Sequence, residues 1–337
     1  MVEGFRALEN EQPKPLFHDP LAAKLVGDHG KEILATIPRH FVAAWSVVIR
    51  TVIIDHYIRQ AVAAGVDTIL NLGAGLDTRP YRIELPSSLR WIEVDFPHMI
   101  ELKETRLADE KPGCRLERIK LDLTDRALRR RLFSNVNARA GKILVLTEGV
   151  IPYLTNEDVA ELADDLRQAK KIGFWITDYF SPEAIRYGEK MRARFMRNAP
   201  FRFNPKDWFS FFGEHGWRAS EIRYIAEEAN RLGRPIPLSF FVLAWIGLKT
   251  LFASRARRDR MRKFAAYVLL VPERPRRRQA ASSRMTRSVA SGGCGARVVW
   301  LESLQLASFT TTPACAPLSL GSVGSTMDSP LSSMKKV

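Results

Sequence analysis

Short apolar runs of strand length alternate with segments of helical periodicity over the first three quarters of the chain. The runs that predict strands are Thr68–Leu72, Leu89–Val94, Leu116–Leu121, Ile143–Thr147, Gly173–Asp178, Trp217–Ile225 and Ala266–Val271. Strands that alternate with helices are typical of a doubly wound, Rossmann-like α/β fold with a mostly parallel sheet. We expect the last two runs to be antiparallel strands at one edge of that sheet.

Helical segments between these runs are marked by their spacing and by their ends. Apolar residues recur at helical spacing from Trp45 to Ile53, and Gly65 is expected to end that helix. Thr155 and Asp158 have the spacing of a capping box. They predict the start of a helix between the fourth and fifth strands, as a parallel crossover requires.

Three segments depart from the alternation. Residues 183–212 are rich in aromatic and basic side chains, and we interpret them as a helical cap insertion over the site. Residues 238–252 are apolar, but they fall short of the ~20 residues of a membrane span and include Lys249, so a buried or cofactor-side helix is expected. Residues 275–337 are basic and Ser/Thr-rich without a period, which predicts a disordered tail after a domain of residues 1–274.

The composition, 46% hydrophobic and 26% charged, is that of a globular protein. The net charge of +15 would suit nucleic acid, but its distribution does not. Residues 254–274 carry +5 and residues 275–337 carry +6, which leaves +4 for residues 1–253. The basic charge is therefore local to the C-terminal quarter, and no specific nucleic-acid partner is expected.

The cysteines and histidines are few and scattered. Three cysteines and six histidines show neither disulfide-framework nor metal-ligand spacing, so no metal is expected. So few cysteines agree with a reducing compartment, and residues 1–15 lack the apolar core of a secretory signal. We therefore expect a cytoplasmic protein.

Two glycines follow the first predicted strand. Gly73 and Gly75 allow the chain to turn sharply and its backbone to approach a ligand closely. The third glycine of a dinucleotide fingerprint is missing, and residues 78–80 read Thr-Arg-Pro instead, which argues against NAD. On its own, this pair of glycines is also compatible with a tight turn that binds nothing.

Acidic residues stand at the ends of the next strands. Asp95 follows the glycines by about 20 residues, the separation at which an acid can bind both ribose hydroxyls. Glu93 is expected to be a solvated or ion-paired group at an edge. Asp122 and Leu123 end the third strand, where a carboxylate and an apolar neighbour can hold an adenine ring.

Glu148 ends the apolar fourth strand. Because an unpaired buried carboxylate is costly, Glu148 should have a cationic partner. That partner is either a bound ammonium or sulfonium group or Arg50. Polar groups at four successive strand ends of an apolar sheet favour a ligand over packing alone.

Together these motifs resemble the leucine carboxyl methyltransferase and polyketide O-methyltransferase family of class I S-adenosylmethionine-dependent enzymes. The matching segments span about residues 15–274 and read FHDPLAAKL, RT at positions 50–51, NLGAGLDTRPYR, EVDFP, LDL, TEGVIPYL and AAYVLLVPERP. The resemblance implies S-adenosyl-L-methionine as cofactor and a small-molecule methyl acceptor.

The resemblance also implies roles for matching residues. It assigns the methionine carboxylate to Arg50, the methionine moiety to Gly73 and Gly75, the ribose to Asp95, the adenine to Asp122 and Leu123, and the methionine end near the reacting centre to Glu148. Tyr153 joins Glu148 as a catalytic candidate, although an aromatic residue there can equally serve packing. His98 is expected to be a surface helix residue.

The acceptor stays open between a carboxylate and a hydroxyl, on a polyketide-like or lipid-like molecule. A carboxylate acceptor would need no general base at neutral pH, because it is already ionised. The alternative function is a binding protein for membrane surfaces or anionic partners on a degenerate methyltransferase fold. It would use the apolar and basic residues 238–263 for peripheral membrane contact, and it would not need an intact Arg50, Asp95 and Glu148.

Overall fold

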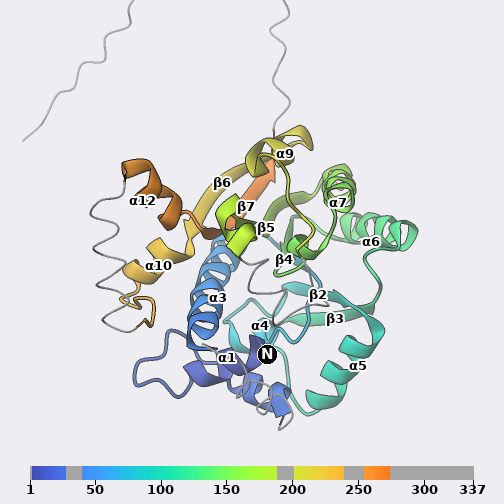
Figure 1. Cartoon of the computed structure of the whole chain (residues 1–337). Coiled ribbons are helices and arrows are strands. Elements are labelled where there is room, and N and C mark those ends of the chain that lie inside the picture. Colours follow the sequence, from blue (N-terminus) through green and yellow to red (C-terminus); the bar gives the residue numbers. More distant parts are fainter. Residues whose placement is uncertain (1, 28–39, 188–200, 239–253, 274–337) are drawn as a thin grey trace, which may run out of the picture. The chain divides into compact units, whose positions relative to one another are not determined.

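A seven-stranded sheet forms the centre of the structure (Figure 1). The computed structural model describes residues 2–27, 40–187, 201–238 and 254–273. The strands follow the order β3-β2-β1-β4-β5-β7-β6. They are β1 (Thr68–Leu72), β2 (Arg90–Asp95), β3 (Arg115–Lys120), β4 (Ile143–Thr147), β5 (Ile172–Phe180), β6 (Trp217–Tyr224) and β7 (Ala265–Pro272).

The first five strands are parallel, and β7 runs antiparallel between β5 and β6. This arrangement confirms the doubly wound fold and the antiparallel pair at one edge. The strand order reverses between β1 and β4, where the chain leaves the sheet in opposite directions. Ligands of open α/β sheets bind beyond the carboxyl ends of the strands at this switch point.

Helices pack on both faces of the sheet (Figure 1). They are α1 (Val2–Glu9), α3 (His40–Ala63), α4 (Arg79–Arg82), α5 (Pro97–Arg106), α6 (Arg126–Arg139), α7 (Asn156–Gln168), α9 (Trp208–Glu214), α10 (Ile225–Arg231), α12 (Arg255–Arg262) and the 3-10 turn η1 (Ile151–Tyr153). One buried cluster joins α6, α7 and α9 to the sheet, and the other joins α3 and α10 to its opposite face.

Strand β4 shows why an inner strand of the sheet is almost wholly apolar. Ile143 and Val145 belong to the cluster with α6 and α7, whereas Leu144 and Leu146 belong to the cluster with α3. Successive side chains of a strand point to opposite faces, so burial on both faces demands a continuous apolar run.

The predicted helix ends are confirmed. Helix α3 is followed by Gly65 with φ +87°, a conformation that favours glycine. Thr155 caps α7 through a full capping box with Asp158, whose backbone N–H donates to Thr155 Oγ1 at 3.1 Å. These caps fix where each crossover leaves and re-enters the sheet.

Helix α3 is, by length and composition, apolar enough to cross a membrane over Phe41–Ala63. In the fold its inner face is part of the protein core, where Ile49, Ile53 and Tyr57 are fully buried. Core helices of this kind pass the same length and composition test.

Several sequence predictions fall outside the described residues. These are the tail 275–337, nearly all of the apolar segment 238–252, and residues 188–200 of the cap insertion. From the described part of that insertion, Phe203, Trp208 and Phe212 pack into the core near Trp175.

Candidate active site

The glycine turn after β1 lies against the loop after β4. Gly73 has φ +68°, and a Cβ added there would come within 2.5 Å of Val150 Cγ2. Gly75 has φ +48° with no neighbouring atoms in the way. Gly73 is therefore required both by its backbone conformation and by the close approach of two strand ends.

Asp95 holds the glycine turn from the end of β2. Its Oδ2 accepts a hydrogen bond from the Gly75 N–H at 2.6 Å, and its Oδ1 accepts one from the Phe96 N–H at 2.7 Å. A carboxylate has about four acceptor positions, so these two bonds leave capacity for the hydroxyls of a ribose. Asp95 and the glycine turn are therefore in direct contact.

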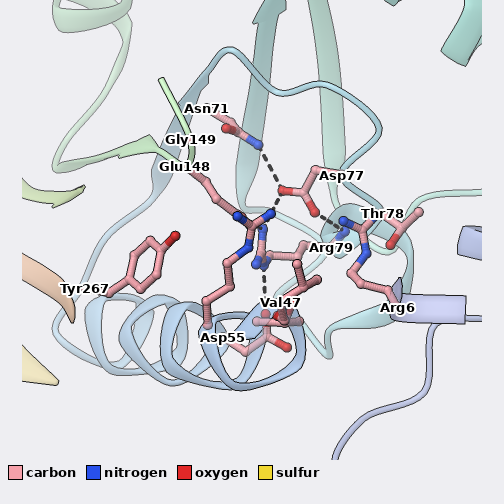
Figure 2. A network of polar contacts seen from close by, with 12 residues as sticks. Arg6, Val47, Asp55, Asn71, Asp77, Thr78, Arg79, Glu148, Gly149 and Tyr267 are labelled. Atoms are coloured by element: carbon pink, nitrogen blue, oxygen red, sulfur yellow. Dashed lines mark hydrogen bonds and ion pairs between the residues drawn. The ribbon is translucent and has the colours of Figure 1, made fainter. Parts of the chain in front are cut away.

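Glu148, at the end of β4, lies beside Arg79 (Figure 2) and is also paired with Arg50. Its Oε1 is 2.9 Å from Arg50 Nε, and its Oε2 accepts a hydrogen bond from Arg79 Nη1 at 2.7 Å. Burial alone would raise the pKa of Glu148, but the charges of Arg79 and Arg50 outweigh it and hold that pKa below the usual range. Arg50, one of the two alternative partners considered for Glu148, is therefore present beside it, together with Arg79 as a second cation.

Arg50 and Arg79 differ in how much more they can bind. The Arg50 side chain is 18% exposed, and its Nε is 2.9 Å from Glu148 Oε1. The Arg79 side chain is 1% exposed and is enclosed by protein. Arg50 is thus the guanidinium that can turn a fork of donors toward a ligand carboxylate.

Sequence reasoning gave no role of its own to Arg79, which organises the site (Figure 2). Arg79 pairs with Asp55 at 2.7 Å, Asp77 at 2.9 Å and Glu148 at 2.7 Å. Asp77 also accepts a hydrogen bond from Asn71 at the end of β1, at 2.9 Å. The network ties α3, β1 and β4 together and fixes the position of the Glu148 carboxylate.

Asp122 and Leu123 follow β3. Asp122 is exposed, and its Oδ1 accepts hydrogen bonds from the N–H and the hydroxyl of Thr124, at 2.9 and 2.8 Å. The Leu121 N–H donates to the Asp95 carbonyl at 2.9 Å, so this segment begins beside the end of β2. The adenine role of the pair stays a prediction.

An aromatic cavity opens beyond the end of β5. Its volume is about 140 Å³, and its lining includes Ile151, Pro152, Asp178, Tyr179, Phe180, Phe201, Phe203, Lys206, Asp207, Trp208 and Phe209. Tyr153 is 37% exposed and meets the ring of Phe201 edge-on, at 5.5 Å between ring centroids. Tyr153 thus lies beside the cavity, in contact with one of its walls.

Asp178 is a buried acid of this cavity that sequence reasoning missed. It is 3% exposed and accepts hydrogen bonds from Tyr267 Oη at 2.7 Å and from the Gly149 N–H at 2.9 Å. Burial raises the pKa of Asp178 to about 6, against the lowering effect of the Tyr267 hydrogen bond and of Arg50. Since Gly149 follows Glu148, the cavity and the Glu148 site meet at Asp178.

His98 and Glu93, the other two titratable residues considered from the sequence, lie on α5 and β2. His98 is exposed on α5 and stacks on Phe96, as expected of a surface residue. The expectation of an edge position for Glu93 is wrong, because Glu93 is fully buried in β2, between β1 and β3. It is ion-paired there with Lys103 at 2.6 Å and with Arg118 at 3.0 Å.

Comparisons with known proteins point to one family for this chain. The family model of leucine carboxyl methyltransferase matches residues 1–167. A protein of Frankia alni is 30% identical over 256 residues, which are 69% of this chain and 86% of that relative. A protein of Streptomyces coelicolor is 29% identical over 252 residues, 70% of this chain and 87% of that relative. Both relatives are named "Putative S-adenosyl-L-methionine-dependent methyltransferase".

The chain therefore belongs to the leucine carboxyl methyltransferase family, and it is an S-adenosyl-L-methionine-dependent methyltransferase. Among solved structures, a DUF574 family protein from Streptomyces avermitilis has a TM-score of 0.45 at 15% identity, over 81% of this chain and 97% of that one. Magnesium protoporphyrin IX methyltransferase from Synechocystis, with bound SAH, has a TM-score of 0.43 at 11% identity, over 76% of this chain and 100% of that one. At TM-scores below 0.5, neither likeness adds to the assignment.

Proposed function

We propose that this methyltransferase transfers a methyl group to an oxygen atom of a small-molecule acceptor. The supporting observation is the hydrogen bond from the Gly149 N–H to Asp178, which joins the Glu148 site to the aromatic cavity. A methyl donor held at Glu148 and an acceptor held in the cavity would meet at this junction.

The side chains at the strand ends fit the parts of S-adenosyl-L-methionine. The partly exposed Arg50 guanidinium suits the methionine carboxylate, and Glu148 suits the ammonium group beside it. Asp95 suits the ribose hydroxyls, the backbone at Gly73 and Gly75 suits a close approach of the methionine moiety, and the pair Asp122 and Leu123 would take the adenine.

When bound, the cofactor supplies a methyl group already activated by its sulfonium. The protein therefore needs chiefly to position the acceptor and to exclude water. The cavity walls, formed by Phe180, Phe201 and Trp208, serve both needs for a flat apolar acceptor. Tyr153 is proposed as an orienting group at the wall.

The alternative function, a membrane-surface binding protein on a degenerate fold, is not favoured by the site. Such a protein would not need the paired Arg50, Arg79 and Glu148 or the contact between Gly75 and Asp95, all of which are present. Peripheral membrane contact through residues 238–263 stays a prediction, for which flotation of the protein with anionic vesicles is the test.

The experiment that tests oxygen methylation is product analysis. The protein is incubated with S-adenosyl-L-methionine and a panel of phenols, alcohols, carboxylates, thiols and amines. Mass spectrometry then detects the added methyl group, and mild alkali separates methyl esters, which hydrolyse, from methyl ethers, which survive. Methylation of oxygen acceptors supports the proposal, and methylation confined to nitrogen or sulfur acceptors contradicts it.

A further inference from the structure

We propose that Asp178 is the catalytic base of this enzyme and that it selects a hydroxyl acceptor over a carboxylate. The inference rests on the proposed function and narrows its substrate class. Asp178 lines the aromatic cavity at the point where the cavity meets Glu148, through the bond to Gly149. An acceptor oxygen that reaches the cofactor's methyl group from the cavity would therefore pass beside the Asp178 carboxylate.

The carboxylate is held in place and keeps free acceptor positions. Tyr267 Oη binds its Oδ1 and the Gly149 N–H binds its Oδ2. These two contacts come from β7 and from the loop after β4, so they fix the carboxylate from two sides. About two of its four lone-pair positions are left for an acceptor O–H.

The charges around Asp178 determine whether its carboxyl group is ionised. Arg50 from α3 favours its ionised form, and Glu148 from β4 disfavours it, as does burial. Lys206 and Asp207, both exposed, line the same cavity from the segment before α9. With its pKa at about 6, Asp178 is ionised at pH 7 to 8 yet binds a proton far more readily than an exposed aspartate.

An ionised Asp178 discriminates between acceptors. A hydroxyl can donate its proton to the carboxylate in a charge-assisted hydrogen bond. An acceptor carboxylate has no proton to donate at neutral pH and would bring a negative charge against Asp178 and Glu148 in a buried place. The cavity volume of about 140 Å³ is close to that which holds a benzene ring, so phenol is a suitable probe.

The step balances without a further reactant. The acceptor O–H bond breaks and its proton passes to Asp178. The oxygen forms a bond to the methyl carbon, while the methyl–sulfur bond breaks and leaves its electron pair on sulfur. The sulfonium charge is lost, and Asp178 releases the proton to water once the methyl ether has left.

The test compares Asp178→Asn with wild-type protein, using phenol and benzoate as probes. We expect wild-type protein to methylate phenol in preference to benzoate, and Asp178→Asn to lose about 10² to 10⁴-fold in kcat for phenol. Calorimetry should show S-adenosylhomocysteine binding within twofold of wild type. The matched control is Asp164→Asn, which removes an exposed carboxylate of α7 that does not line the cavity. It should keep the wild-type kcat.

Tyr267→Phe keeps the proposal testable if Asp178→Asn fails to fold. Since the Tyr267 hydrogen bond lowers the pKa of Asp178, its loss should move the acid limb of the kcat profile up by about one pH unit. A purely structural role of Asp178 would leave that limb in place, and an unmoved limb overturns the proposal.

Other outcomes distinguish failure of the Asp178 assignment from failure of the proposed oxygen methylation. If Asp178→Asn loses S-adenosylhomocysteine binding in proportion to activity, Asp178 belongs to the cofactor site and the proposal is overturned. Preference of wild-type protein for benzoate also overturns the Asp178 proposal, but it leaves the proposed oxygen methylation intact. If wild-type protein binds S-adenosylhomocysteine but methylates only a nitrogen or sulfur acceptor, the proposed function fails and this inference falls with it.

Discussion

Asp178 and Tyr267 are register partners across β5 and β7, and Tyr267 Oη donates a hydrogen bond of 2.7 Å to Asp178 Oδ1. The pair lies where the antiparallel edge of the sheet joins the parallel part. Both side chains are almost fully buried, and Asp178 also binds the backbone beside Glu148. The antiparallel strand β7 thus positions a carboxylate at the carboxyl end of β5. In parallel α/β sheets, ligands bind beyond these strand ends.

Ionisation of Asp178 should reduce the stability of the fold. The folded pKa of about 6 exceeds the ordinary 3.8, so the native state holds this proton more tightly than the unfolded chain. The contribution to stability is full below pH 3.8 and is lost as the pH rises through 6 to 7, by up to about 3 kcal/mol. Urea unfolding measures this effect at pH 4.5 and 7.5. The unfolding free energy of Asp178→Asn relative to wild type should be higher at pH 7.5 than at pH 4.5. An equal difference at the two pH values would contradict the raised pKa of Asp178.

The matched control for that measurement is Asp207→Asn. Asp207 is exposed, and its hydrogen bond with Ser210 lowers its pKa, so its contribution has the opposite sign. The stabilising contribution of Asp207 is lost as the pH falls through its folded pKa. The unfolding free energy of Asp207→Asn relative to wild type should therefore not increase at the higher pH.

Substitution of Asp95 should weaken cofactor binding. We expect Asp95→Ala to lose about 1.5–3 kcal/mol in affinity for S-adenosylhomocysteine, the range for hydrogen bonds to a charged group. The affinity of Asp95→Asn should lie between those of wild type and Asp95→Ala, because an amide keeps one acceptor oxygen for the Gly75 N–H. Titration calorimetry on folded protein measures both, and unchanged affinity in Asp95→Ala would remove the ribose role.

Arg50 should matter for its shape as well as its charge. Arg50→Lys should raise the dissociation constant of S-adenosylhomocysteine about tenfold, because an ammonium group cannot reproduce the guanidinium fork. The fold should be retained, since Arg79 still pairs with Glu148 at 2.7 Å. Wild-type affinity in Arg50→Lys with none in Arg50→Ala would mean that charge alone acts there. Wild-type affinity in both would exclude the carboxylate role.

Gly73 should tolerate no side chain. Gly73→Ala combines a φ of +68° with a Cβ placed 2.5 Å from Val150 Cγ2, and we expect it to lower the unfolding free energy by about 2–4 kcal/mol. Val150→Ala should recover the steric part in a double-mutant cycle and leave the backbone part. Strict additivity of the two substitutions would show that the loops after β1 and β4 do not touch.

The sheet could be predicted from the sequence because its five inner strands are largely buried, whereas the edge strands β3 and β6 are partly exposed. Each apolar run matches a strand within two residues at either end, and β1 and β4 match at both ends. Strand β5 runs on to Phe180, beyond the predicted Asp178, because its antiparallel pairing with β7 continues to that residue. Pairing with a distant strand leaves no local signal.

Residues of the site that belong to recognisable motifs could be anticipated from the sequence. The glycine turn and Asp95 are close in sequence, and they are in contact in the structure. Arg79 could not be recognised as an organising residue, because its partners come from α3, from its own turn and from β4. Nor could Asp178, whose cavity is assembled from segments far apart in the chain.

Titration of the folded wild-type protein with S-adenosylhomocysteine tests the methyltransferase site most directly. Calorimetry should show one ligand bound per chain, with affinity lowered by Asp95→Ala and by Arg50→Lys and unchanged by Asp207→Asn. Protein that is folded by circular dichroism yet binds no S-adenosylhomocysteine, or that binds it equally well without Asp95 and Arg50, would contradict the assignment of this site.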